Sequence, residues 1–257
     1  MKAIILAGGF GTRISEETIS KPKPMVEIGG MPILWHIMKI YSAHGINEFI
    51  ICCGYKGYMI KEFFANYSMH MSDVTFDLRS GQMHVHKNNS ESWKVTLVDT
   101  GSESMTGGRL LRVREHIKKN EDFCFTYGDG LSNVNISDLI KFHKSNNKLA
   151  TMTVVRPPGR YGAAILNEDI VESFQEKPDG DGSWINGGFF VVNERAIDLI
   201  KDESVSWEDE PLRLLSKKGE LCAYKHHDFW QAMDTLREKN MLNKLWEEEN
   251  TPWKVWE

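Results

Sequence analysis

The chain begins with a short apolar run that opens directly into a glycine-rich loop. Residues 3–6 read Ala-Ile-Ile-Leu, residues 7–13 read Ala-Gly-Gly-Phe-Gly-Thr-Arg, and Lys-Pro-Lys-Pro follows at 21–24. An apolar run that ends at glycine is typical of a strand, and glycines allow successive backbone N–H groups to converge on an anion. Arg13 and Lys23 add positive charge. The sequence therefore predicts a strand followed by a phosphate-binding loop.

Two common phosphate-binding motifs do not match this loop. A dinucleotide-binding fingerprint that starts at Gly9 and Gly11 needs a third small residue at the position of Ile14. The P-loop pattern G-x-x-x-x-G-K-[ST] occurs nowhere in the sequence. A plain glycine turn after an edge strand is the simplest alternative, but it leaves Arg13 and the paired prolines unexplained.

Composition narrows the class of protein. The chain has 257 residues, of which 41% are hydrophobic, and this is enough for one full α/β core. Its formal net charge of -5 argues against a nucleic-acid partner. The sequence has no run near 18 apolar residues, and the first apolar run ends within six residues, so neither a membrane span nor a signal peptide is expected. We expect a cytoplasmic protein.

The order of apolar runs predicts the fold. Strand-like runs alternate with amphipathic helices over residues 1–155, which is typical of a mostly parallel sheet covered by helices on both faces. We expect a single Rossmann-like α/β domain over 1–257, with a nucleotide-binding part at about 1–155. Antiparallel additions at 162–166 and 170–175 fall in a sugar-binding part at about 156–235. Residues 66–105 are polar and predict short strands with loops, as in an excursion that contacts another subunit.

The loop and later blocks together resemble the sugar-phosphate nucleotidylyltransferases, which join a sugar 1-phosphate to a nucleoside triphosphate. After the loop come FTYGDG at 125–130, FQEKP at 174–178, NGGFF at 186–190 and WQAMDT at 230–235, in the order of that family's active-site blocks. This chain departs from the usual family pattern at Glu16, where a proline is common. The blocks at 25–30, 32–36, 51–56 and 105–109 resemble the members that use CTP and glucose 1-phosphate to make CDP-glucose.

The resemblance implies roles for individual residues. The nucleotide would lie against Leu6, Ala7, Gly8, Gly9, Phe10, Gly11, Thr12, Arg13, Lys23, Ser104, Arg109 and Gly128. The sugar phosphate would contact Glu176 and Lys177, and the hexose would lie against Gly162, Asn186 and Gly187. Trp230 would offer a stacking face or belong to the core. The resemblance also implies a homo-oligomer, of which a hexamer is one form, and a role in lipopolysaccharide O-antigen synthesis.

Two acidic residues are the candidate metal ligands. Asp129 follows a predicted strand at 123–127 and lies between two glycines, at the strand end where open α/β sheets bind ligands. Asp234 matches the family's second acidic block. The pair would bind Mg²⁺ and leave other positions for phosphate oxygens, with Arg13 and Lys23 as the catalytic cations. The alternatives are an Asp-Gly turn for Asp129 and a helix N-cap for Asp234.

Other functions remain open from the residues alone. A uridylyl- or thymidylyltransferase would use the same groups, because each named catalytic group acts on phosphate, metal or sugar. A non-catalytic subunit that binds nucleotide sugars is the alternative from another class. Retention of Arg13, Lys23, Asp129 and Asp234 argues against that alternative.

Overall fold

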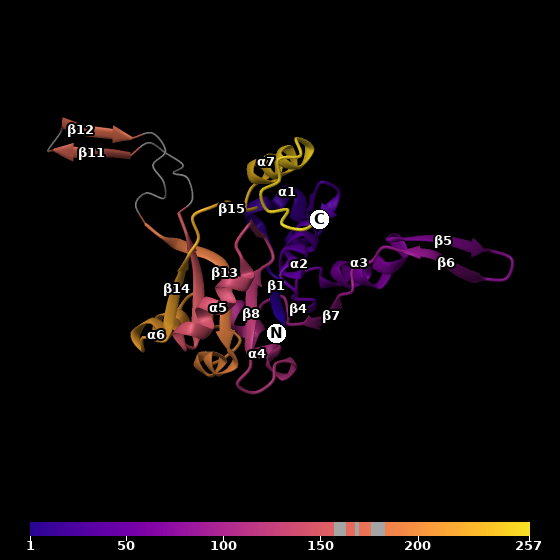
Figure 1. Ribbon diagram of the computed structural model, residues 1–257, viewed down its shortest axis with the longest axis horizontal. Helices are drawn as coiled ribbons and strands as arrows, with labels where there is room; N and C mark the ends of the chain where they lie inside the picture. Colours follow the sequence, from indigo (N-terminus) through magenta and orange to yellow (C-terminus); the bar gives the residue numbers. More distant parts are fainter. Residues whose placement is uncertain (157–162, 168–169, 176–182) are drawn as a thin grey trace.

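A twisted, mostly parallel sheet organises the molecule (Figure 1). The computed structural model describes residues 1–156, 163–167, 170–175 and 183–257. Within these ranges the central sheet has seven strands, in the order β14 (Leu221–Lys225), β10 (Ala150–Val155), β13 (Ile185–Asn193), β8 (Asp122–Tyr127), β1 (Ala3–Ala7), β4 (Glu48–Cys53) and β7 (Lys94–Asp99). In this sheet β13 runs antiparallel to both of its neighbours, and the other pairs are parallel. The predicted fold class is confirmed.

Helices connect the strands of the central sheet, and short pairs of strands lie outside it. The α-helices are α1 (Ser15–Thr18), α2 (Ile33–Ala43), α3 (Gly57–His70), α4 (Thr106–Arg112), α5 (Ile136–Asn146), α6 (Glu210–Lys217) and α7 (Leu236–Glu247). The 3₁₀ turns are η1 (Thr12–Ile14), η2 (Lys23–Met25), η3 (Arg114–His116) and η5 (Glu194–Leu199). The paired short strands are β2 (Glu27–Ile28) with β3 (Met31–Pro32), β5 (Ser72–Asp77) with β6 (Gln82–Asn88), β9 (Gly130–Ser132) with β15 (Trp230–Ala232), and β11 (Ala163–Asn167) with β12 (Ile170–Gln175).

Side chains of β1 point alternately to the two faces of the sheet, and both faces are buried. Ala3, Ile5 and Ala7 join the core on one face of the sheet, where α2, α5 and α7 pack. Ile4 and Leu6 join the core on the other face, which α4, η5 and α6 cover. A strand buried on both faces is uniformly apolar, and such a strand holds its carboxyl end in a defined place. The glycine loop that follows Ala7 therefore starts from a rigid support.

The predicted excursion at 66–105 is shorter in the structure. Helix α3 continues to His70, and β7 belongs to the central sheet, where it pairs with β4 in parallel. Of residues 66–105, only the β5–β6 hairpin stands away from the body of the molecule, beyond the end of α3 (Figure 1). Short strands were expected here, and β5, β6 and β7 are short strands. The polar sequence did not indicate that β7 joins the central sheet or that α3 reaches His70, because both elements are only partly buried and need few apolar residues.

The antiparallel additions have the predicted pairing. Strands β11 and β12 form an antiparallel pair, with Ala164 opposite Phe174. Gly162, Glu176 and Lys177, which were predicted to contact the sugar phosphate, lie outside the described residues. Within the described ranges, the structure contains no helix with the length and apolar character needed to span a membrane.

Candidate active site

A cavity of about 660 Å³ opens at the carboxyl ends of β1 and β8. Every predicted site residue in the described part of the chain lines it. They are Leu6, Ala7, Gly8, Gly9, Phe10, Gly11, Thr12, Arg13, Lys23, Ser104, Arg109, Gly128, Asp129, Asn186, Gly187 and Asp234. Ligands of open α/β sheets bind at this edge. The cavity therefore lies where the sequence predicts a ligand site, and the predicted residues line it.

The glycine loop has its shape for two different reasons. Gly11 has φ +66°, a conformation that favours glycine, and begins the turn η1 that carries Arg13. Gly8 is required by packing instead, because a Cβ atom there would lie 1.9 Å from Nη1 of Arg109. A Cβ at Gly9 would have no heavy atom within 4 Å. Gly8 therefore makes room for a protein side chain, and not for a ligand as the sequence suggested.

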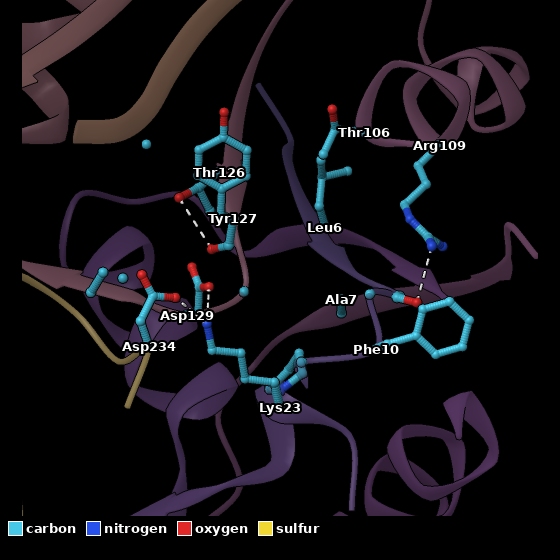
Figure 2. Close-up of a pocket in the computed structure, with 18 of the residues that line it drawn as sticks. Leu6, Ala7, Phe10, Lys23, Thr106, Arg109, Thr126, Tyr127, Asp129 and Asp234 are labelled. Carbon is cyan, nitrogen blue, oxygen red and sulfur yellow. Dashed lines mark hydrogen bonds and ion pairs between the residues drawn. The ribbon is translucent and has the colours of Figure 1, made fainter. Parts of the chain in front are cut away.

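Arg109 ties the loop to the neighbouring strand ends (Figure 2). Its side chain is nearly buried, and burial lowers the pKa of the guanidinium. Nη2 donates to the carbonyl of Gly8 at 3.0 Å, and Nη1 donates to Thr100 Oγ1 and to the carbonyl of Gly101, each at 2.8 Å. A predicted nucleotide contact by Arg109 stays a prediction. What the structure assigns to this side chain is support of the loop.

The four predicted catalytic groups form one charged cluster. Nζ of Lys23 lies 2.5 Å from Asp129 Oδ2 and 2.7 Å from Asp234 Oδ1. Arg13 Nη1 lies 2.6 Å from Asp234 Oδ2. The Lys23 side chain is only 9% exposed, whereas that of Arg13 is 71% exposed. A buried ammonium needs opposite charges around it, and the two carboxylates supply them (Figure 2).

Strand pairing brings the two carboxylates together. Strand β9 directly follows Asp129, and β15 directly precedes the Met233-Asp234 pair. These strands run antiparallel, with Ala232 opposite Gly130, and Met233 N donates to the carbonyl of Asp129 at 2.8 Å. Two residues from distant parts of the chain are thereby held side by side.

The cap of α7 excludes one alternative for Asp234. Thr235 is the N-cap residue, and it forms a capping box with Glu238. The Glu238 carboxylate accepts hydrogen bonds from the backbone N–H groups of Asp234 and Thr235. The Asp234 side chain is therefore not the helix cap and is available to the cavity.

The expected hexose end is built from a hydrogen-bonded wall. Asn186 Nδ2 donates to the hydroxyl of Tyr127 at 3.1 Å, and Trp230 Nε1 donates to the carbonyl of Gly187 at 2.6 Å. Trp230 is half-buried and lines the cavity. Trp230 is thus neither a fully buried core residue nor a free stacking face.

Among the lining residues that sequence reasoning missed, three are joined by hydrogen bonds. Thr106, Tyr127 and Glu208 lie on different elements, and the Glu208 carboxylate accepts hydrogen bonds from both hydroxyls. Tyr127 belongs to the block at 125–130 that was noticed for its aspartate. Glu208 stands in the acidic run at 208–210, which was the available signal, but a run of exposed acidic residues is usually a solvated surface.

Comparison with known proteins shows to which family the chain belongs. The family model described as nucleotidyl transferase matches residues 2–235. The chain belongs to the nucleotidyl transferase family. It is 62% identical over 257 residues to the glucose-1-phosphate cytidylyltransferase of Salmonella typhimurium, with 100% of both chains covered. It is also 27% identical to the mannose-1-phosphate guanyltransferase of Schizosaccharomyces pombe, over 94% of this chain and 62% of that one.

Solved structures confirm the nucleotidyl transferase fold. The UDP-glucose pyrophosphorylase of Acinetobacter baumanii superposes with a TM-score of 0.71. The match covers 98% of this chain and 95% of that one, at 18% sequence identity. At such identity the likeness concerns the fold alone.

The acidic pair of this nucleotidyl transferase suits a shared cation. Oxygens of Asp129 and Asp234 converge on a single nitrogen of Lys23, so both carboxylates reach one cationic centre. Two carboxylates with further positions for phosphate oxygens and water are typical of Mg²⁺ sites. Within the described residues, no group of three or more His, Cys, Asp or Glu side chains could hold a metal ion. Phosphate oxygens of the substrates and water would occupy the remaining positions of a metal at this pair.

Proposed function

We propose that this chain transfers a cytidylyl group from CTP to glucose 1-phosphate, giving CDP-glucose and pyrophosphate. The observation that carries the proposal is the 62% identity, over the full length of both chains, to a glucose-1-phosphate cytidylyltransferase. The charged cluster at the cavity supports it, because a binding subunit without catalysis would have no use for two carboxylates and two cations at one point.

The reaction is an in-line displacement at phosphorus. A phosphate oxygen of glucose 1-phosphate attacks the α-phosphorus of CTP, the bond to the β-phosphate oxygen breaks, and pyrophosphate leaves with that bonding pair. No covalent bond to the protein is needed. Catalysis then consists of holding two polyanions in line and neutralising the charge that develops on the α-phosphoryl group and the leaving group.

We assign the cluster to this task. Arg13, exposed at the cavity, offers a planar fork for two phosphate oxygens. Lys23 offers a point charge from the rigid Pro22-Lys23-Pro24 segment. Asp129 and Asp234 would hold Mg²⁺, which when bound supplies positive charge next to the reacting phosphates.

A pyrophosphate-release assay tests the proposal. The protein is incubated with glucose 1-phosphate and CTP, UTP, dTTP, ATP or GTP, each below saturation, and reactions without the sugar phosphate serve as controls. We expect CTP to exceed UTP by about tenfold or more in kcat/KM, because a base that does not match leaves buried polar groups unpaired. A preference for UTP or dTTP would contradict the cytidylyl assignment.

We also propose that the protein works as a homo-oligomer in which the β5–β6 hairpin contacts a second copy. One face of the hairpin is apolar: Val74 pairs with Val85 and Phe76 pairs with Met83. Phe76, Met83 and Val85 are at least half exposed. A two-stranded hairpin is marginally stable by itself, and an exposed apolar face of this kind marks an interaction surface.

We also propose a cellular setting for the reaction. We propose that it takes place in the cytoplasm, where nucleoside triphosphates are made, and that CDP-glucose serves lipopolysaccharide O-antigen synthesis, as the family resemblance implies. Removal of the gene should then abolish sugars derived from CDP-glucose in the surface polysaccharide. Unchanged polysaccharide composition would contradict this role.

A further inference from the structure

Two elements from opposite ends of the chain meet beside the charged cluster. The turn η1 and the helix α1 carry the segment that contains Arg13, and α7 begins two residues after Asp234. The helices α1 and α7 lie side by side (Figure 1). Nη1 of Arg13 lies 2.6 Å from Oδ2 of Asp234, across 221 residues of sequence. This ion pair is one connection between the two elements.

A second ion pair joins the same two elements. Nζ of Lys239 on α7 lies 2.5 Å from Oε1 of Glu17 on α1, across 222 residues of sequence. The side chains of Glu17 and Lys239 are each 21% exposed, whereas that of Arg13 is 71% exposed. Because salt and water screen buried charges less than exposed ones, this second pair is the better protected of the two.

The order of the four charges fixes how the elements align. On the N-terminal element the cation Arg13 precedes the anion Glu17. On the C-terminal element the order is reversed, because the anion Asp234 precedes the cation Lys239. A shift of one element along the other would bring like charges together, which is unfavourable. The two pairs therefore favour a single register of α1 against α7.

The backbone between Arg13 and Glu17 is closed by its own hydrogen bonds. The hydroxyl of Thr18 donates to the carbonyl of Gly11 at 3.1 Å and to that of Ile14 at 3.2 Å. The backbone N–H of Ile14 also donates to the carbonyl of Gly11, and the Ile14 side chain is fully buried. The turn η1 and the helix α1 are thus one unit, so the position of Glu17 determines that of Arg13.

Helix α7 is a firm support for the other partner. Its first turn is held by the capping box of Thr235 and Glu238. Further along, Asn243 Oδ1 accepts a hydrogen bond from the backbone N–H of Gly29 at 2.9 Å. Lys239 lies between these two attachments, so its ammonium group extends from a part of the helix that is held on both sides.

The proposed reaction weakens the first of the two ion pairs. Phosphate oxygens that bind the guanidinium of Arg13 compete with Asp234 for its N–H groups. Among the described residues, the pair of Glu17 and Lys239 is then the remaining ion pair between α1 and α7. Neither of these two residues lines the cavity. Their pair can therefore persist while the substrates bind.

We propose that Glu17 and Lys239 are positioning residues, whose ion pair holds η1 and α1 against α7 and so keeps Arg13 in place when its guanidinium exchanges Asp234 for the phosphates of CTP. This inference rests on the proposed function. Since a misplacement of about 1 Å far from the chemistry can lower a rate about a hundredfold, loss of this pair should be measurable in the reaction.

The test compares variants that remove one charge or both. Glu17→Gln and Lys239→Gln each keep a polar side chain, and a third protein carries both changes. We expect each single variant to lower kcat/KM for CTP about tenfold, and the double variant to lose no more than either single one. KM for glucose 1-phosphate should not change. Glu16→Gln is the matched control, because Glu16 is the exposed neighbour on α1 and does not line the cavity; it should keep the wild-type values.

A second comparison separates positioning of Arg13 from general support of the fold. Glu17→Gln is also made in an Arg13→Ala protein, where its effect on kcat/KM for CTP should shrink to less than about twofold. A merely structural role would give the same factor in both backgrounds. Calorimetric affinity for CTP supplies this comparison if turnover of Arg13→Ala is too slow to measure. Urea unfolding should show little change, because a partly exposed ion pair adds little stability.

Three results would overturn the inference. The first is wild-type kcat/KM for CTP in both single variants. The second is a double variant whose loss equals the product of the two single losses, since the residues would then act independently. The third is an equal loss from Glu17→Gln with and without Arg13. Wild-type protein that releases no pyrophosphate, or prefers another triphosphate, would instead refute the proposed function. The background comparison is made with whichever triphosphate the protein uses, so the two failures are distinguishable.

Discussion

At the scale of single residues, the charged groups of the site act as a unit. Lys23 contacts both carboxylates, and Arg13 contacts one of them. Removing any one charge leaves the remaining charges unbalanced, and breaking a buried pair is more costly than its net contribution suggests. Effects of substitutions in this cluster should therefore not be additive.

Asp129→Asn and Asp234→Asn should each lower kcat at least about a hundredfold while the fold survives, because each removes an anionic ligand from the reacting centre. Steady-state pyrophosphate release measures the loss, and circular dichroism checks the fold. Asp209→Asn is the matched control, since Asp209 is exposed and does not line the cavity. Turnover near that of wild type in either variant would mean that this carboxylate is not part of the catalytic site.

Arg109→Lys should lower the free energy of unfolding by at least about 2 kcal/mol, since one ammonium cannot replace a guanidinium that donates to several buried acceptors. KM for CTP should rise as the loop loosens. Urea denaturation and steady-state kinetics measure the two effects. Wild-type stability combined with a raised KM would show that Arg109 acts on the nucleotide directly and not through the loop.

At the scale of elements, the last helix and the C-terminal residues complete the core around α2. His36 on α2 is fully buried, donates from Nε2 to the carbonyl of Ile28 at 2.8 Å, and accepts a hydrogen bond from Trp253 at Nδ1. Rings of Trp246 and Trp253 pack against it at 5.0 and 6.2 Å. Because α7 begins two residues after Asp234, with Thr235 as its N-cap, this packing supports the site.

Burial lowers the pKa of His36 from 6.5 to about 4. As pH falls below 6.5, the unfolded chain takes up a proton that the folded chain refuses, so stability is full above pH 6.5 and declines toward pH 4. Between pH 7 and pH 5 this single group should remove about 2 kcal/mol. Urea unfolding at both pH values, compared with His36→Gln, isolates the effect. Parallel losses in both proteins would show that His36 is not responsible.

At the scale of the whole molecule, the sheet separates the site from the subunit contact that we propose. The cavity lies at the carboxyl ends of β1 and β8, while the β5–β6 hairpin stands beyond α3, past the β7 edge (Figure 1). A substitution on the hairpin should therefore affect oligomeric assembly more than it affects the chemistry of the active site.

The double variant Phe76→Ser and Met83→Ser should reduce the native mass measured by light scattering after size exclusion, because it removes the paired apolar residues of the hairpin face. His84→Ser, on the same strand but opposite Thr75 on the other face, is the control and should keep the wild-type mass. An unchanged mass in the double variant would contradict an interface at this face.

The sequence by itself determined the features that depend on neighbours along the chain. The apolar run at 3–6, its glycine loop and the alternation of strands and helices are local patterns, and each has its counterpart in the structure. The blocks that carry Asp129, Asn186 and Asp234 were recognisable for the same reason. Their residues line one cavity because β8 ends there, the antiparallel strand β13 begins there, and β15 pairs with β9 directly after Asp129.

Only the tertiary structure decided how the polar groups of the site are paired. Lys23 bridges Asp129 and Asp234 across separations of 106 and 211 residues, Arg109 uses backbone acceptors at Gly8, and Glu208 reaches Tyr127 across 81 residues. Residue type tells which groups donate or accept. Which donor meets which acceptor depends on the packing of segments far apart in the chain, and no local pattern records it.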